Sequence, residues 1–229
     1  MYDIDFVRVY SKANEILATS SVITKFPYKI GELVKEQSDI RLCKYSKALE
    51  KYGISIKSFG SKSAIWMEYG GANIIFYNEK EVKQRIRFSI GHEYGHFVFG
   101  HKMNLKESDP LYKKQEIEAN CFSAQLLMPE QLIREATRRG KTPNANFIIE
   151  SFDVSPEAAD RRKETLARYD SEWRKRSERV YDDIILNRFS SFLNTIAPMN
   201  EYSSYDYDYE YRQQQEREKW FDTRTRWSK

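Results

Sequence analysis

The spacing of hydrophobic residues along this chain changes from a helical period to the alternation of strands and back again. In residues 2–19, apolar side chains such as Val7 and Ile16 recur at helical spacing, which predicts a helix. Further helices are predicted over residues 30–36 and over residues 39–52, where a glycine follows the second pattern. The N-terminal quarter of the chain is therefore expected to be helical.

Two short segments then show the alternation that is typical of strands. Residues 64–69 alternate between the two faces of a strand, and residues 72–77 are rich in β-branched and aromatic side chains. Between them, Gly70 and Gly71 favour a tight hairpin turn. We expect an antiparallel hairpin, and its second strand could pair with an extended peptide.

Another helical pattern follows the hairpin. Asn78 and Glu81 have the spacing of a helix N-cap and its partner three residues later, so a helix should begin here. Apolar residues such as Ile90 extend this pattern toward His101. The polar residues 102–114 that come next are expected to form a loop.

The helical period returns in the C-terminal half. Residues 115–128 predict a helix that Pro129 interrupts, and a proline suits the first turn of the next helix, which should end at Gly140. Residues 149–167 predict either a simple helical hairpin or a small helix–turn–helix, and the hairpin is the more common outcome. Helices around a small sheet make this an α+β fold.

Composition narrows the class of protein. The chain has 229 residues, of which 40% are hydrophobic and 31% charged, and no apolar run approaches the ~18 residues of a membrane span. Its two cysteines, Cys43 and Cys121, lie far apart, and the first residues lack the pattern of a secretory signal. We therefore expect a cytoplasmic protein with no membrane partner.

The C-terminal third differs in composition from the rest. Residues 161–179 are basic, but interleaved acidic side chains favour a solvated helical face over a nucleic-acid contact. Residues 200–229 are low in complexity and are expected either to be disordered or to dock on a partner, and to regulate rather than catalyse. The chain is accordingly divided into a domain over residues 1–140, a helical region over residues 141–199, and this tail.

The strongest chemical signal is the HExxH motif His92-Glu93-Tyr94-Gly95-His96. On a helix, residues four apart lie on one face, so the two imidazoles can bind one tetrahedral metal ion. Glu93 is then placed to accept a proton from a water molecule at that metal. A single helical histidine is more often a core or surface group, but all three histidines of the chain fall within residues 92–101.

A hydrolytic metal site needs a third protein ligand and an open position for water. His101 is expected on the same helix but on a different face from His96, which does not suit a shared metal. A carboxylate on the next helix is the natural source, and Glu116 and Glu118 both compete for the role. We favour Glu116, because Asn120 one turn later could orient its carboxylate.

These residues carry a resemblance to a known family. The run RFSIGHEYGHFVFGH followed by EIEANCFSAQLLMP resembles the ImmA/IrrE family of metallopeptidases, in which HExxH is paired with a downstream E-x-x-A-N-x-F-A…LLMP segment. The positions that match this pattern are His92, Glu93, His96, Glu116, Ala119, Asn120, Phe122, Leu126, Leu127, Met128 and Pro129. Ser123 stands where the family usually has alanine. The resemblance extends to the preceding strand and helix and, more loosely, to residues 146–168, but not to residues 200–229.

The resemblance implies a compact thermolysin-like zincin fold followed by a mainly helical region. It also implies a zinc ion on His92, His96 and Glu116, with Glu93 as the general base. Manganese is a possible substitute, because two imidazoles and a carboxylate discriminate weakly among such ions. The substrate that the resemblance implies is a helix–turn–helix repressor, cleaved to release gene expression.

A rival hypothesis is a binding module, in which a metal-stabilised fold senses a ligand or holds a regulator without cutting it. Retention of Glu93 favours the enzyme, because a purely structural metal site needs no base. A hydrolase of this kind also needs a donor that stabilises the oxyanion, and the sequence does not identify it among 16 tyrosines.

Overall fold

The structure of the protein is a computed structural model that describes residues 4–37, 39–60, 62–168 and 179–199. In chain order, its helices and strands are α1 (Phe6–Thr19), α2 (Ile30–Gln37), β1 (Ile40–Lys44), α3 (Tyr45–Tyr52), the 3₁₀ helix η1 (Ile56–Phe59), β2 (Ala64–Tyr69), β3 (Ala72–Tyr77), α4 (Lys83–Val98), α5 (Pro110–Leu127), α6 (Glu130–Arg138), α7 (Ala145–Phe152), α8 (Pro156–Arg168), α9 (Asp182–Arg188) and α10 (Ser190–Ile196). The predicted tail, residues 200–229, lies outside the described residues.

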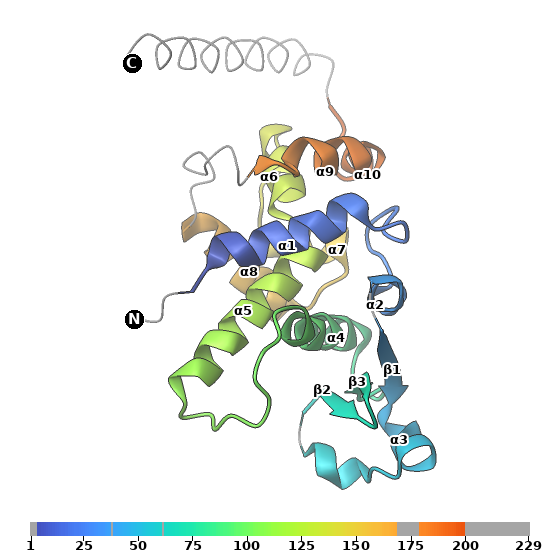
Figure 1. The fold of residues 1–229 in the computed structure, drawn as a ribbon. Coiled ribbons are helices and arrows are strands. Elements are labelled where there is room, and N and C mark those ends of the chain that lie inside the picture. Colours follow the sequence, from blue (N-terminus) through green and yellow to red (C-terminus); the bar gives the residue numbers. More distant parts are fainter. Residues whose placement is uncertain (1–3, 38, 61, 169–178, 200–229) are drawn as a thin grey trace.

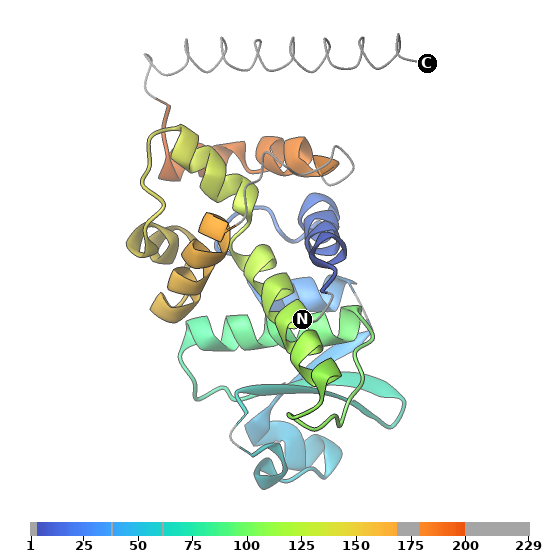
Figure 2. The ribbon, with the colours of Figure 1, turned by 90° about the vertical axis from the view of Figure 1, so that its left-hand side faces the viewer.

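The elements are arranged in layers around α4 and α5, as Figure 1 shows. A small sheet and α3 lie at one end, and α4 packs across β2 and β3. Helix α5 crosses α4, and α1 packs on α5 (Figure 2). Helices α6, α9 and α10 pack together at the other end. The molecule thus has the predicted α+β fold, and none of the described helices is long and apolar enough to cross a membrane.

The described residues form a mixed sheet with the strand order β1-β3-β2. β3 pairs antiparallel with β2 and parallel with β1, so β2 is an edge strand. The hairpin occupies the predicted residues, and both glycines of its turn have positive φ, 58° at Gly70 and 74° at Gly71. The expectation that residues 72–77 pair with a peptide is wrong, because β3 already has a neighbour on each side.

The segment predicted as one helix over residues 39–52 is instead the strand β1 followed by the helix α3. Ile40 and Cys43 of β1 are buried, and the strand pairs with β3. This tertiary pairing outweighs the local helical pattern, which is only a weak determinant in short segments. α3 ends where expected, at Gly53, whose φ of 68° lies in the left-handed region.

Helix α4 begins later than the capping pattern predicts. Its N-cap is Val82, and the Oδ1 atom of Asn78 accepts a hydrogen bond from the backbone N–H of Lys80 at 3.1 Å. Glu81 accepts a hydrogen bond from the Ser63 hydroxyl at 3.4 Å rather than capping the helix. Asparagine can make such a local turn instead of an N-cap, and here the turn prevails.

Helix α5 begins earlier than predicted, inside the segment expected to be a loop. The carboxylate of Asp109 caps the helix by accepting a hydrogen bond from the N–H of Leu111 at 2.8 Å. Pro110 occupies the first helical position, where its fixed φ and missing N–H are favourable. The dipeptide that suggested a loop is therefore the start of a helix.

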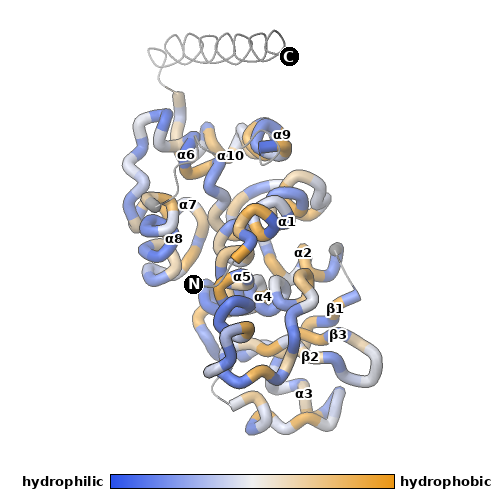
Figure 3. Tube along the Cα trace, turned by 60° about the vertical axis from the view of Figure 1, so that its left-hand side comes forward, coloured by the Kyte–Doolittle hydropathy of each residue, from blue (hydrophilic) through white to orange (hydrophobic). Residues whose placement is uncertain are grey.

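A hydrophobic core runs through the helical layers and reaches the sheet. It takes buried side chains from α1, such as Val9, from α5, such as Phe122, and from α10, such as Leu193. Figure 3 shows hydrophobic segments along β2, β3 and α1. The helix pair predicted over residues 149–167 is α7 and α8, which pack against each other, although α7 begins before the predicted range, at Ala145.

Small residues allow α4 and α5 to approach closely, and we call Gly91, Gly95, Ala119 and Ser123 the α4–α5 seam. A Cβ atom at Gly91 would lie 2.6 Å from the Ser123 Oγ, and one at Gly95 would lie 3.2 Å from the Ala119 Cα. The Ser123 hydroxyl also donates a hydrogen bond to the carbonyl oxygen of Phe88 at 2.9 Å. The seam therefore sets the separation and register of the two helices that carry the site.

Candidate metal centre

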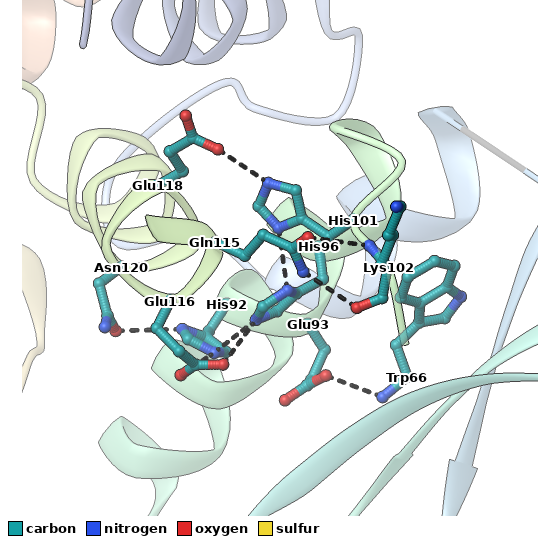
Figure 4. Close-up of polar contacts among 10 residues, drawn as sticks. All are labelled: Trp66, His92, Glu93, His96, His101, Lys102, Gln115, Glu116, Glu118 and Asn120. Atoms are coloured by element: carbon teal, nitrogen blue, oxygen red, sulfur yellow. Dashed lines mark hydrogen bonds and ion pairs between the residues drawn. The ribbon is translucent and has the colours of Figure 1, made fainter. Parts of the chain in front are cut away.

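Helix α4 presents two histidines on one face, as its sequence spacing predicts. The Nε2 atoms of His92 and His96 lie 3.0 Å apart, and Figure 4 shows the two rings converging. Both side chains are only partly exposed, so the surrounding residues limit their rotamers. The converging nitrogens form one side of a possible metal site.

Helix α5 supplies Glu116 across the seam. Its Oε1 lies 3.3 Å from the His96 Nε2, and its Oε2 lies 3.5 Å from the His92 Nε2. These are the residues within the described ranges that form a cluster able to hold a metal ion, with ligand atoms within 4.8 Å of one another. Tetrahedral ligands at zinc bond lengths stand about 3.3 Å apart, so the donor atoms fit such an ion.

The outer nitrogens of both histidines have partners of their own. The His92 Nδ1 lies 3.0 Å from the Asn120 Oδ1, and the His96 Nδ1 lies 2.9 Å from the His101 Nδ1. These contacts leave the two Nε2 atoms facing Glu116. Asn120 was expected to orient Glu116, but this contact is with His92, because α5 places Asn120 opposite that ring across the seam.

Glu118, the rival candidate for third ligand, contacts His101 instead. Its Oε2 lies 3.1 Å from the His101 Nε2, and its side chain is buried. His101 is not on the helix, since α4 ends at Val98 and Gly100 has a φ of 62°. This pair was not predicted from the sequence, although a glycine just before His101 is a recognised signal for the end of a helix.

Glu93 lies beside the three candidate ligands, His92, His96 and Glu116, but is not one of them. Its Oε2 accepts a hydrogen bond from the backbone N–H of Trp66 at 2.8 Å, so the carboxylate is held toward the edge strand β2 (Figure 4). The Trp66 indole N–H in turn donates to the Asn73 Oδ1 at 3.1 Å. The site therefore combines a possible metal cluster with a separate, oriented carboxylate.

Electrostatic interactions within the cluster favour a charged carboxylate. Burial opposes ionisation of Glu116, but hydrogen bonds and charge from His92 and His96 outweigh it and lower the pKa of Glu116. Burial likewise opposes protonation of His92, yet contacts with Glu116 and the charge of Glu93 give a net rise in its pKa. Burial, followed by the charge of His96, lowers the pKa of His101 to about 3, so His101 is neutral at physiological pH.

Tyr112 borders the same cluster. It lies one helical turn before Glu116 on α5, close enough for the charge of Glu116 to act on its hydroxyl. Burial and then the negative charges of Glu116, Glu107 and Glu93 raise the pKa of Tyr112. The hydroxyl therefore keeps its proton at neutral pH and remains a hydrogen-bond donor.

Two histidines from an HExxH helix, a glutamate from the following helix and an adjacent carboxylate are the arrangement of a metallopeptidase. The model of the Peptidase_M78 family, described as the IrrE N-terminal-like domain, matches residues 36–164, more than half of the 229-residue chain. The chain belongs to this family of metallopeptidases, which confirms the resemblance that the sequence carries. No curated protein matches the chain.

Proposed function

We propose that the protein is a zinc-dependent endopeptidase that cleaves a helix–turn–helix transcriptional repressor. The observation that supports catalysis most directly is the position of Glu93, beside the His92, His96 and Glu116 cluster but outside it. A structural metal site uses all of its protein groups as ligands, whereas a catalytic site keeps a base and an open coordination position. The local chemistry therefore favours hydrolysis over a purely structural metal.

Two imidazoles and one carboxylate suit zinc, and they tolerate manganese because such a donor set discriminates weakly among divalent ions. His92, His96 and Glu116 would hold the ion through the atoms that converge in Figure 4. When bound, zinc supplies Lewis acidity, which polarises the scissile carbonyl and makes a water molecule acidic near neutral pH. The remaining steps belong to residues of this chain.

Glu93 takes the proton of the attacking water and later gives it to the leaving amine. Because the Oε2 of Glu93 already accepts a hydrogen bond from the Trp66 N–H, we assign the transfer of the water proton to Oε1. The water oxygen bonds to the carbonyl carbon, the peptide bond breaks, and the transferred proton completes the new amino group. In this reaction Glu93 acts as a base in the first step and as an acid in the second.

The outer edge of β2 is the surface on which we expect an extended substrate to lie. Within the described residues β2 pairs only with β3, and its Trp66 N–H points away from β3 to reach Glu93. Backbone groups alternate in direction along a strand, so those of Ala64 and Glu68 point to the same side. A peptide strand added at this edge would pass directly beside the base.

The choice of a repressor as substrate rests on the family resemblance and on the absence of an obvious DNA-binding surface in α8. Of the basic side chains of α8, Arg161 pairs with Glu157 at 2.7 Å and Lys163 pairs with Asp160 at 3.3 Å. Such pairs are typical of a solvated helix. A partner that binds DNA would supply that function, and the free thiols Cys43 and Cys121 suit a cytoplasmic setting.

The test is incubation of the zinc-loaded protein with a helix–turn–helix repressor encoded near it, followed by intact-mass analysis. We expect two fragments whose masses sum to that of the repressor plus one water, and a chelator should prevent their formation. Tight binding without fragments would instead support the rival hypothesis of a binding module. If no neighbouring repressor were bound or cleaved, the proposed substrate class would be wrong.

We further propose Tyr112 as the donor that stabilises the oxyanion. It lies one helical turn before the candidate ligand Glu116 on α5, and the negative charges of Glu116 and Glu93 help to raise the pKa of its hydroxyl. Tyr112→Phe should lower kcat roughly 10²-fold while KM and zinc content stay nearly unchanged, because one oxyanion donor acts mainly in the transition state. Steady-state cleavage kinetics measure the effect, with Tyr181→Phe on the N-cap of α9 as the matched control. Equal kcat in the two variants would remove Tyr112 from the mechanism.

A further inference from the structure

The end of α4 folds His101 back onto His96. The N–H of His101 donates to the carbonyl oxygen of His96 at 3.0 Å, and the N–H of Gly100 donates to that of Phe97 at 3.0 Å. With Gly100 in the left-handed region, these two bonds form a Schellman motif. In this motif the residue after the glycine commonly makes a hydrophobic contact with the residue five positions earlier, but here both positions are histidines.

A chain of side-chain contacts leads outward from the metal cluster through this motif. The His96 Nδ1 lies 2.9 Å from the His101 Nδ1, and the His101 Nε2 lies 3.1 Å from the Glu118 Oε2 (Figure 4). His101 is 8% exposed and Glu118 is 4% exposed, so water competes little for these hydrogen bonds. The Lys114 Nζ lies 3.9 Å from the other carboxylate oxygen of Glu118 and balances part of its charge.

Metal binding by His96 would determine where the protons lie on His96 and His101. If His96 binds a cation through Nε2, its ring proton must reside on Nδ1, which then donates to the His101 Nδ1. His101 accepts at Nδ1 and therefore carries its own proton on Nε2, which donates to the carboxylate of Glu118. Every donor thus meets an acceptor, and only one tautomer of each histidine fits.

We propose that His101 and Glu118 are positioning residues that fix the tautomer and ring orientation of His96 for metal binding. The Glu118 carboxylate accepts a hydrogen bond from the Nε2–H of His101 and so increases the electron density of the His101 ring. The His101 Nδ1 is therefore a better acceptor for the proton on the His96 Nδ1. That in turn makes the Nε2 of His96 a stronger ligand. This inference rests on the proposed metal site at His92, His96 and Glu116.

The proposal differs from a purely structural role for a buried histidine–carboxylate pair. A structural pair would stabilise the fold whether or not metal is bound, and its loss would lower the melting temperature without a selective effect on metal. A positioning pair changes the affinity and the ligand field of the metal. The two roles therefore separate when metal binding and the stability of the chelator-treated protein are measured independently.

The experiment compares three variants of the full chain. His101→Phe removes both ring nitrogens, His101→Asn keeps an acceptor at the place of Nδ1, and Glu118→Gln keeps an acceptor but removes the charge. Zinc affinity is measured by competition with a chromophoric chelator, and the ligand field by the visible spectrum of the cobalt-loaded protein. We expect His101→Phe to weaken zinc binding roughly 10- to 100-fold and to shift the cobalt bands.

His101→Asn should recover most of this loss, and Glu118→Gln should have a smaller effect than His101→Phe. Glu135→Gln is the matched control, because Glu135 is a buried carboxylate of α6 that pairs with Arg139 at 2.9 Å. That variant should change the melting temperature but not zinc affinity. Unchanged zinc affinity and cobalt spectrum in His101→Phe would overturn the positioning role. Lack of stoichiometric zinc in the unaltered protein would overturn the proposed metal site itself, and the positioning role with it.

Discussion

Glu93→Gln should bind zinc as the unaltered protein does, keep its melting temperature, and lose the ability to cleave a cognate repressor. The amide preserves the shape of the side chain and can still accept the Trp66 N–H, but it cannot take a proton from water. We expect kcat to fall by at least ~10²-fold. Cleavage rate by intact-mass analysis and zinc content by metal analysis are the two measurements.

The matched control for this prediction is Glu157→Gln, which makes the same chemical change on α8, where Glu157 pairs with Arg161 near the surface. This control should cleave at the normal rate. Turnover of Glu93→Gln within a few fold of the control would exclude Glu93 as the general base. If Glu93→Gln instead lost its zinc, the residue would have to be reassigned as a ligand.

Glu116→Gln should abolish stoichiometric zinc binding, whereas Glu118→Gln should retain one zinc per chain with lower affinity. Glu116 provides oxygen atoms 3.3 Å and 3.5 Å from the two histidine Nε2 atoms, while Glu118 faces His101. A neutral amide is a poor ligand for zinc, so loss of the Glu116 charge leaves only two good donors. Metal analysis after equilibration with one equivalent of zinc distinguishes the two variants.

The comparison of the two glutamates carries its own control, because both substitutions make the same chemical change on the same helix two residues apart. Loss of zinc in Glu118→Gln alone would show that the ligand assignment is wrong. Loss in both variants with a common fall in melting temperature would point to disruption of α5 instead. Circular dichroism of each chelator-treated variant makes that distinction.

The parts of this fold that the sequence predicted correctly depend on neighbours in the chain. Gly70 and Gly71 favour a specific turn whatever surrounds them, so the hairpin of β2 and β3 was predicted at its true bounds. The helical spacing of His92 and His96 likewise fixes their common face. Both inferences depend only on interactions between residues a few positions apart, and the local sequence pattern predicts such interactions well.

The parts that the sequence did not predict depend on residues far apart. β1 is a strand because β3 lies beside it, and nothing in residues 39–52 alone specifies that neighbour. The contact of Asn120 was misjudged, and that of Glu118 with His101 was not predicted, for the same reason, since the register of α5 on α4 decides which side chain each one meets. The early start of α5 is a different case, because Asp109 and Pro110 carried a local signal that also fits a turn.

The α4–α5 seam connects metal binding to the stability of the whole fold. Glu116 meets His92 and His96 only when the two helices are docked, so a cation that uses all three ligands binds the folded chain in preference to the unfolded one. By mass action, the free energy of unfolding then rises with the free concentration of that cation. We expect the lifetime of the protein in a cell to follow the supply of available zinc, because a chain deprived of the ion opens more often and exposes the docked faces of its helices to proteases.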